Sequence, residues 1–326
     1  MATNIIQKIK NDGLAGCGGA GFPVWKKWEA AKRAKNDVKY IVCNGSEGEP
    51  LVQKDKFILE KYPAEVINGI KIALETITHS QAYIYLNKLY FQQFKEKLTN
   101  LIGNAPIKLF EKPDGYLAGE ETTLLNVIEG KKAEPRTKPP YPTESGLWGK
   151  PTLINNVETF YWISKIAKGE YQNKRFYCIS GQAPNKGVYE LPENYTIEQI
   201  LKETKNYPFP STNYFYQVGG GASGEILLAN ELEKPIHGIG SIIIFNKAST
   251  NPLSLMKGWA EFFIKNNCDQ CAPCREGIYR INEMLIKNIL DRSTLNNILA
   301  VLEKTSLCPF GRMAAVPFKT AMERLF

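Results

Sequence analysis

Long hydrophobic runs are missing from this sequence of 326 residues. No apolar stretch approaches the roughly 18 residues that a helix needs to cross a membrane, so a direct membrane span is excluded. The opening residues, MATNIIQKIKND, carry no apolar core of the kind found in secretory signal peptides. We therefore expect a cytoplasmic protein, whose association with a membrane would be peripheral and through a larger complex.

Histidine is scarce, and the number of cysteines is odd. The two histidines, His79 and His237, are interpreted as ordinary structural residues rather than catalytic bases. There are 7 cysteines, and an odd number without an export signal argues against a disulfide framework. Most of them gather near the end of the chain, which favours a local thiolate site there.

The charge balance excludes a further class of protein. Lys and Arg outnumber Asp and Glu by 41 to 33, which gives a net charge of +8. A nucleic-acid-binding protein usually concentrates basic and aromatic residues on one element, whereas the lysines here are dispersed. We therefore expect no nucleic-acid partner. The hydrophobic content of 43% predicts a folded protein, and the length predicts two or three domains.

Strand and helix signals alternate through the first half of the chain. Short apolar runs predict three strands, at 38–44, 82–87 and 107–111. Amphipathic patterns predict five helices, at 24–35, 63–77, 88–102, 122–130 and 156–169. Pro23 is expected in the first turn of the first helix, and Gly130 at the end of the fourth. The alternation favours a parallel sheet, and we assign residues 1–172 to an α/β domain.

The rest of the chain changes character twice. Runs such as RFYCISG and SIIIFN make residues 173–250 rich in β signals, and we predict a small β-grasp-like domain there. Residues 251–326 carry apolar side chains three or four positions apart, which predicts a small helical bundle. Its helices are expected at 252–267, 274–290, 293–304 and 314–325.

Four cysteines form the most specific motif. Cys268, Cys271 and Cys274 make a C-x₂-C-x₂-C run, and the distant Cys308 precedes Pro309. Structural zinc sites usually combine two separated C-x₂-C pairs. Three thiolates on one tight turn with a remote fourth are typical of [4Fe–4S] ligation. The spacing favours an iron–sulfur cluster over zinc, and over plain buried cysteines.

A glycine-rich loop and two acidic stretches lie earlier in the chain. GCGGAG, residues 16–21, matches G-x-G-x-x-G, but the segment before it looks helical where a Rossmann fingerprint needs a strand. Its amides can cradle a phosphate at the start of the following helix; the alternative is a mobile glycine turn. CNGSEGEP follows a strand and YLAGEETTLL leads into a helix. Their acids either face a ligand or serve only the helix dipole.

Taken in this order, the motifs resemble the NADH-oxidising flavoprotein subunit of respiratory complex I, a family that also occurs in NAD-linked hydrogenases and formate dehydrogenases. The matching stretches are GGAGFPVWKKW, CNGSEGEP with KDK, GYLAGEETTLLNVIEGKKAEPRTKPPYP, SGLWGKPTLINNVET, ELP, and EFFIKNNCDQCAPCREG with Cys308. The resemblance implies a multidomain protein of class α/β plus α. Its parts would be a Rossmann-like FMN- and NADH-binding domain at 1–172, a β-grasp domain of the soluble-ligand-binding (SLBB-like) type at 173–250, and a helical bundle with an Fe–S cluster at 251–326.

The resemblance also assigns site residues by motif. The flavin would contact the glycine loop and the ends of the strands, through Gly16, Gly18, Gly19, Gly21, Lys27, Asn44, Gly119, Glu120, Asn155 and Asn156. Ser46 would lie at the flavin–nicotinamide region. NADH would be positioned by Glu49 and Glu121, stacked by Phe22 and Tyr141, and contacted by Lys138. The cluster ligands would be Cys268, Cys271, Cys274 and Cys308.

The implied chemistry explains this set of cofactors, which is FMN, NAD(H) and one [4Fe–4S] cluster. NADH gives up two electrons as a hydride, whereas the cluster takes one at a time, so FMN has to stand between them. No side chain needs to act as a catalytic acid, base or nucleophile. Because a single cluster must pass its electrons on, we expect a partner with another iron–sulfur centre, first of all a thioredoxin-like [2Fe–2S] subunit.

Several residues depart from the family pattern. Ala15 and Cys17 stand where arginine is usual, Ser46 where an acid is common, Ala30 where a second stacking aromatic is found, and Tyr141 where phenylalanine is usual. The departures leave two alternatives to NADH oxidation. The same cofactors would be fed by NADPH or by reduced ferredoxin, or the chain would be a non-enzymatic scaffold with a structural metal.

Overall fold

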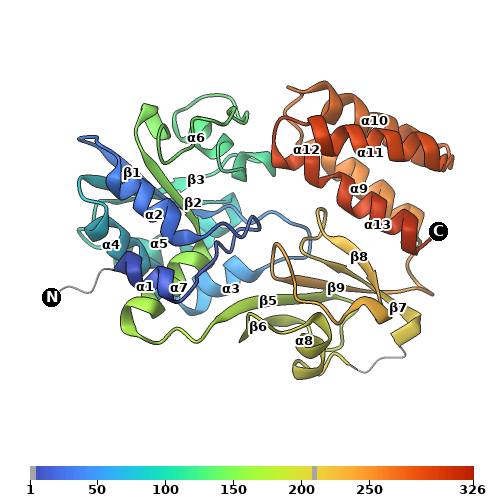
Figure 1. Ribbon diagram of the computed structural model, residues 1–326, viewed down its shortest axis with the longest axis horizontal. Helices are drawn as coiled ribbons and strands as arrows, with labels where there is room; N and C mark the ends of the chain where they lie inside the picture. Colours follow the sequence, from blue (N-terminus) through green and yellow to red (C-terminus); the bar gives the residue numbers. More distant parts are fainter. Residues whose placement is uncertain (1–4, 208–210) are drawn as a thin grey trace.

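The computed structural model describes residues 5–207 and 211–326 of the chain. Figure 1 shows two separate sheets, each with its own helices, and a group of C-terminal helices that lies beside both. Each of these three parts has a hydrophobic core, and the core of the C-terminal helices also includes Leu117 from the first part and Phe215 and Ile226 from the second sheet. The domain boundaries after residues 172 and 250 stay predictions.

The first sheet has four parallel strands in the order β3-β2-β1-β4. They are β1 (Lys39–Gly45), β2 (Ser80–Leu86), β3 (Ile107–Glu111) and β4 (Thr152–Asn156). The chain places β2 and β3 on one side of β1 and then returns to place β4 on the other side. The strand order therefore reverses between β1 and β4, and ligands of open α/β sheets bind outside the carboxyl ends of the strands at such a point.

Helices cover the two faces of this sheet unequally. One face is buried by apolar residues of α1 (Ile5–Asn11), α2 (Val24–Arg33), α3 (Lys54–Lys61), α4 (Pro63–Thr76), α5 (Lys88–Ile102) and α7 (Val157–Lys168). The other face is covered by α6 (Thr123–Ile128) and by Leu147 from the long connection between β3 and β4. That connection passes the end of β1, where the Asn44 side chain donates to the Gly119 carbonyl, and returns to the start of β4, where the Thr152 N–H donates to the Pro142 carbonyl.

Local sequence explains where these helices begin and end. The Asn87 side chain accepts a hydrogen bond from the backbone N–H of Tyr90, which caps α5. Asn156 ends β4 and also caps α7, because its side chain accepts from the N–H of Glu158. Gly169 closes α7 in the left-handed conformation, with φ of 73°. Asn156 is thus fixed by both its strand and its helix.

The second sheet has five strands in the order β6-β5-β9-β7-β8. They are β5 (Lys174–Gly181), β6 (Gly187–Pro192), β7 (Tyr214–Val218), β8 (Glu225–Leu228) and β9 (Ser241–Asn246). Only β5 and β9 are parallel, and α8 (Ile197–Glu203) packs against one face. A β-rich part is confirmed here, whereas its membership of the β-grasp class stays a prediction.

The C-terminal part is helical, as expected. It contains α9 (Pro252–Asn266), α10 (Ala272–Ile286), α11 (Arg292–Thr305), α12 (Pro309–Met313) and α13 (Ala315–Arg324). Short 3₁₀ helices elsewhere are η1 (Leu117–Gly119), η2 (Leu147–Gly149), η3 (Ser211–Asn213) and η4 (Ala229–Glu231). None of the helices within 5–207 and 211–326 combines the length and the apolar character that a membrane crossing requires.

The predicted strands and α-helices need five additions and two corrections. The sequence did not predict β4, α3, α8, α12 or the separate strand β8. Pro23 lies just before α2 as its N-cap residue, not in the first turn. The helix expected from residue 274 already begins at Ala272, because Pro273 suits the first turn of a helix.

Candidate functional site

The carboxyl ends of β1 and β4 bring four predicted flavin residues together. Asn44 and Asn156 are paired across the two strands, and the Asn156 side chain donates to the Asn44 carbonyl at 3.2 Å. The Asn44 amide donates to the Gly119 carbonyl at 2.9 Å, and the Ser46 hydroxyl donates to Asn44 Oδ1 at 2.5 Å. Any Cβ on Gly119 would lie 2.3 Å from the Ser46 hydroxyl, so only glycine allows this approach. Asn155 lies one position before Asn156 and is buried.

The glycine loop lies against the same strand ends. Its ends are held together by a bridge between Ala15 and Pro23 and by a 2.9 Å hydrogen bond from Gly16 N–H to the Phe22 carbonyl. The N–H of Cys17 donates to the Thr159 hydroxyl on α7 at 3.1 Å. A Cβ on Gly18 would lie 3.5 Å from Asn156 Cβ. The loop therefore adjoins the N-terminus of α7, which is the arrangement that binds phosphate.

Two glycines of this loop have conformations that other residues rarely adopt. Gly19 has φ of 109° and Gly21 has φ of 62°, so both turns require glycine. A Cβ on Gly21 would meet no described atom within 4 Å, which leaves open space beside the loop. The loop thus offers both backbone N–H groups and room for a ligand.

Glu121 is held between two lysines beside this edge. Lys27 Nζ contacts one oxygen of its carboxylate at 2.5 Å, and Lys138 Nζ contacts the other at 2.7 Å. Burial opposes ionisation of Glu121, but the two lysines outweigh burial, and the pKa of the carboxyl is lowered. Two cations against one carboxylate leave one net positive charge. That charge fits a phosphate-bearing cofactor, so the donors present suit FMN or a dinucleotide.

Glu120 caps a helix in this structure. One of its oxygens accepts hydrogen bonds from the N–H and the hydroxyl groups of Thr122 and Thr123, at 2.6 to 2.9 Å. This satisfies donors at the start of α6, which is the structural role that the sequence offered as an alternative. A contact of Glu120 with the flavin stays a prediction.

Glu49 connects the first and second parts of the molecule. Its buried carboxylate accepts from the Tyr116 hydroxyl at 2.9 Å, from the N–H of Ala222 at 2.8 Å and from the Ser223 hydroxyl at 2.6 Å. Ala222 and Ser223 belong to the turn between β7 and β8. Both carboxylate oxygens of Glu49 thus have partners within the chain, and its role in positioning NADH stays a prediction.

The two predicted stacking residues are exposed aromatics. Phe22 follows the glycine loop and is 46% exposed, and Tyr141 follows Lys138 and is 55% exposed. Both therefore present ring surface to solvent. Their role in stacking adenine stays a prediction.

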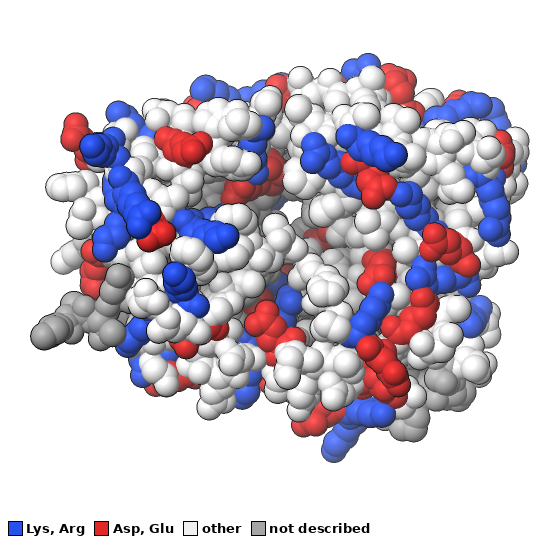
Figure 2. Space-filling model, in the orientation of Figure 1, with Lys and Arg blue, Asp and Glu red and all other residues white. Residues whose placement is uncertain are grey.

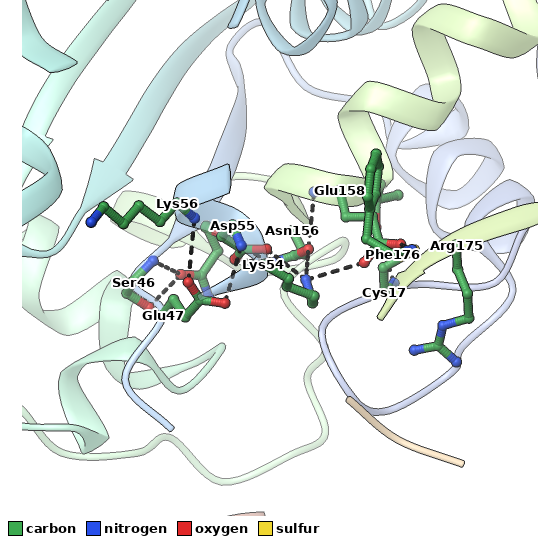
Figure 3. A network of polar contacts seen from close by, with 12 residues as sticks. Cys17, Ser46, Glu47, Lys54, Asp55, Lys56, Asn156, Glu158, Arg175 and Phe176 are labelled. Carbon is green, nitrogen blue, oxygen red and sulfur yellow. Dashed lines mark hydrogen bonds and ion pairs between the residues drawn. The ribbon is translucent and has the colours of Figure 1, made fainter. Parts of the chain in front are cut away.

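A buried polar network behind the site was not predicted (Figure 3). Lys54 Nζ lies 2.5 Å from Asp55 Oδ1 and 3.2 Å from Glu158 Oε2, and all three side chains are at most 4% exposed. Asn156 donates to Asp55 at 2.6 Å and accepts from Lys54 at 3.1 Å. Burial would lower the pKa of Lys54, but Asp55 and Glu158 raise it above its ordinary value. The network fixes the Asn156 amide at the strand end, and the KDK motif was its only signal in the sequence.

Glu47, which follows Ser46 in the chain, lies at one end of this network. Its carboxylate accepts from the N–H groups of Asp55 and Lys56 at the start of α3 and from the Tyr90 hydroxyl at 2.7 Å. Burial and the negative charge of Asp55 raise the pKa of Glu47 to about 7, against the opposing effect of Lys54. The sequence analysis selected Ser46 and Glu49 as site residues but did not select Glu47, which lies between them.

The four cysteines of the motif gather at the start of α10 and α12. Cys271 and Cys308 are the N-cap residues of these two helices. Cys274 and Cys308 are buried, and Cys268 and Cys271 are half-buried in the same core. Burial and the three neighbouring cysteines raise the pKa of Cys274 to about 12, because thiolates placed close together repel one another.

The geometry of these thiols bears on the kind of metal centre. Within the described ranges, no three His, Cys, Asp or Glu side chains converge as ligands of one ion would. A cubane presents a separate iron to each of four thiolates, so its ligands are spaced more widely than those of one zinc ion. The donor set of four cysteine thiols fits such a cluster.

Comparison with known proteins gives the class and then the family. Residues 9–165 match a family model described as the Nuo51 FMN-binding domain, and residues 254–325 match the NADH-ubiquinone oxidoreductase-F iron-sulfur binding region. Fold and site thus define a flavoprotein with an iron–sulfur region. The chain belongs to the family of the F subunits of NADH-quinone oxidoreductase. The two matches confirm FMN and a [4Fe–4S] cluster as its cofactors.

Relatives come from two kinds of enzyme complex. The chain is 32% identical to the F 2 subunit of NADH-quinone oxidoreductase from Rhizobium meliloti, over 84% of this chain and 74% of that protein. It is 29% identical to the NAD-reducing hydrogenase HoxS subunit alpha of Cupriavidus necator, over 98% of this chain and 59% of that one. A crystal structure of an NAD⁺-reducing [NiFe]-hydrogenase in the H₂-reduced state matches with a TM-score of 0.89 and 27% identity. The match covers 98% of this chain and 61% of that hydrogenase chain.

Proposed function

We propose that this chain is an electron-input subunit that oxidises NADH with bound FMN and passes single electrons through its [4Fe–4S] cluster to a partner protein. The observation that carries the proposal is the position of Tyr116. Its hydroxyl donates to Glu49, one of the residues predicted to position NADH, and its N–H donates to Asn266 at the end of α9, 2.8 Å away. Its ring lies 5.6 Å from that of Phe310, two residues after Cys308.

Tyr116 therefore contacts both a residue predicted to position NADH and the helices that carry the cluster cysteines. It precedes Gly119 and Glu121 on the connection that reaches the flavin residues. Its ring also packs 5.2 Å from that of Phe262 on α9, so the connection and the cluster helices form one packed unit. This contact supports a flavin and a cluster placed close enough for electron transfer.

The chain's own residues would bind and orient the cofactors. The N–H groups of Gly16 to Gly21 and the start of α7 would hold the flavin phosphate. Lys27 and Lys138 would meet the phosphates or polar groups of the bound cofactors, while Glu121 keeps both lysines in place. Bound FMN would supply the change from two-electron to one-electron chemistry. Cys268, Cys271, Cys274 and Cys308 would hold the cluster.

We also propose a partner with a further iron–sulfur centre, with a thioredoxin-like [2Fe–2S] subunit as the first candidate. The half-buried Cys268 and Cys271 support it, because they bring the cluster side of the chain to the surface. We likewise propose that residues 173–250 form an SLBB-like domain, that domain boundaries follow residues 172 and 250, and that the protein is cytoplasmic. The five-stranded mixed sheet with α8 on one face supports the first of these.

The electron donor is decided by a rate comparison. Protein loaded with FMN and iron is mixed with NADH, NADPH or reduced ferredoxin, and flavin reduction is followed by its absorbance. We expect NADH to be the fastest donor by a wide margin. A faster reaction with NADPH or ferredoxin would replace NADH as the donor, and protein that holds metal but no flavin would point to the scaffold.

A further inference from the structure

The turn that follows Cys268 is held in an unusual conformation. Asp269, the next residue, has φ of 60°, a left-handed value that residues other than glycine rarely adopt. Asn267 fixes one side of this residue, because its side chain accepts from the N–H of Asp269 at 2.8 Å and donates to the Ile264 carbonyl at 2.9 Å. A backbone conformation of this kind persists only where the surrounding contacts impose it.

An arginine holds the other side of Asp269. Arg275 lies near the start of α10, and its Nη1 donates to the Asp269 carbonyl at 2.8 Å. Its Nε donates to the Glu276 carboxylate at 2.7 Å, so two donors of the planar guanidinium are fixed in different directions. The Arg275 side chain is 46% exposed. It therefore acts on the turn from the solvent side and does not itself enter the core around the cysteines.

The peptide group between Asp269 and Gln270 connects this arginine to a cluster ligand. A trans peptide group is planar, and its C=O and N–H point in opposite directions. A contact that holds the Asp269 carbonyl therefore also aims the Gln270 N–H. That N–H hydrogen-bonds the sulfur of Cys268, which opposes the rise in the pKa of the thiol that burial causes.

We propose that Arg275 is a positioning residue for the iron–sulfur cluster: it keeps the Gln270 N–H on the Cys268 sulfur and thereby raises the reduction potential of the cluster. A reduced cluster carries one more negative charge than an oxidised one, so a hydrogen bond to a ligand sulfur stabilises the reduced form more. The inference rests on the ligation by Cys268 proposed above. Iron content, measured first, separates a failure of that ligation from a failure of this inference.

The positive charge of Arg275 would also raise the potential, and a second cation separates the two effects. The pKa of Lys132 is raised by its hydrogen bond with Glu134 and, to a smaller extent, by the charges of Cys268 and Asp269. Lys132 therefore lies within electrostatic reach of the same turn, but its amine pairs with Glu134. Lys132→Gln thus removes a charge near the turn and leaves the contact with the Asp269 carbonyl in place.

Redox titration of the full chain loaded with FMN and cluster, followed by the EPR signal of the reduced cluster, tests the proposal. In Arg275→Gln we expect the reduced-to-oxidised ratio at a fixed potential to fall by about tenfold, which is a midpoint about 59 mV lower for a one-electron couple. Lys132→Gln should shift the midpoint by clearly less. Arg275→Lys keeps the charge but loses the fork that spans Asp269 and Glu276, so its midpoint should lie between those of wild type and Arg275→Gln.

The comparison is made between samples of equal iron content. Equal shifts in Arg275→Gln and Lys132→Gln would assign the effect to charge alone and overturn the proposal, as would a wild-type midpoint in Arg275→Gln. Should Arg275→Gln hold too little iron to titrate, Arg275→Lys decides: a midpoint equal to that of wild type overturns the proposal, and a lower one supports it. The EPR line shape should change in the Arg275 variants and not in Lys132→Gln, because only the former reorient a ligand.

Discussion

At the scale of single residues, charge placement around the strand ends explains the site. Lys27 and Lys138 share Glu121, and behind them Lys54 is shared by Asp55 and Glu158. The first set is half-buried and carries one positive charge in excess, so it can bind an anion. The second set is fully buried and fixes Asn156. The two lysine sites therefore have different roles, one in binding and the other in positioning.

Replacement of Lys27 by methionine should weaken retention of the phosphate-bearing cofactors. One charge-assisted hydrogen bond is worth about 1.5–3 kcal/mol, so we expect the dissociation constant for FMN to rise by about 10- to 100-fold. Fluorescence titration of flavin-free protein measures it. Lys26→Met is the matched control, because Lys26 is exposed over the Trp25 ring, and it should bind FMN as wild type does. Equal weakening in both variants would contradict the specific role of Lys27.

Glu47 should give the protein a pH dependence of its own. Its pKa in the folded state is raised to about 7, so the folded protein holds the proton more tightly than the unfolded chain. The free energy of unfolding should therefore fall as the pH rises from about 4.5 toward 7, by about 2–3 kcal/mol. Glu47→Gln should remove this part of the slope in chemical denaturation series, whereas the exposed Glu96→Gln should keep it. An unchanged slope in Glu47→Gln would refute the assignment.

At the scale of secondary-structure elements, the sequence predicts the helices and strands whose residue pattern is contained within one segment. The helix α5 has the range expected for it, since Tyr90, Phe94 and Leu98 recur every fourth residue behind an asparagine cap. Strand β3 likewise has its expected bounds. Strand β4 was missed because it is five residues long, follows a proline and ends in two polar asparagines. It becomes a strand by pairing with β1, far away in the sequence.

Some features of the site follow from a single segment of the sequence, whereas others depend on contacts between distant segments. The glycine loop and the cysteine run are compact motifs, and the family matches confirm the cofactors that they predicted. The closeness of Ser46 and Gly119, and the capture of Glu49 by Ala222 and Ser223, depend on contacts between distant segments. No pattern within one segment records such contacts, which is why Lys54 and Glu158 were overlooked.

Close packing of α4 on α7 gives an element-scale prediction. A Cβ on Gly69 of α4 would lie 2.0 Å from the Phe160 carbonyl oxygen on α7, so Gly69→Ala must push the helices apart. We expect it to lower the free energy of unfolding by about 1–3 kcal/mol or more. Gly258→Ala is the control, since Gly258 lies inside α9 and a Cβ there meets nothing within 4 Å. It should stabilise the protein by about 0.5–1 kcal/mol, and a loss of stability in that variant would contradict the account.

At the scale of the whole molecule, the two sheets and the C-terminal helices meet around Glu49 and Tyr116. Figure 2 shows the surface hollowed where these parts meet, with basic and acidic residues interspersed on the face in view. Glu49 binds the β7–β8 turn and Tyr116, and Tyr116 binds α9. The proposed flavin and cluster sites are thus joined by one hydrogen-bonded connection. Loss of the cluster should therefore lower the stability of the whole molecule and not only that of the C-terminal helices.

Replacement of Cys308 by serine should remove or damage the cluster. Iron per chain should fall from about four to three or fewer, and the melting temperature should fall because α10 and α12 lose their common anchor. Iron analysis and calorimetry of anaerobically purified protein measure both. Cys178→Ala is the matched control, since Cys178 is a buried cysteine of β5 outside the motif, and it should keep its iron. Full iron content in Cys308→Ser would exclude Cys308 as a ligand.

The central claim is that one chain holds flavin and cluster together and takes electrons from NADH. The most direct measurement is a cofactor assay on anaerobically purified protein: iron, sulfide, zinc and flavin per chain, followed by NADH with the flavin absorbance recorded. We expect about four irons and one FMN per chain, with the flavin band bleached by NADH. Zinc without flavin, or a loaded flavin that NADH leaves unchanged, would contradict it.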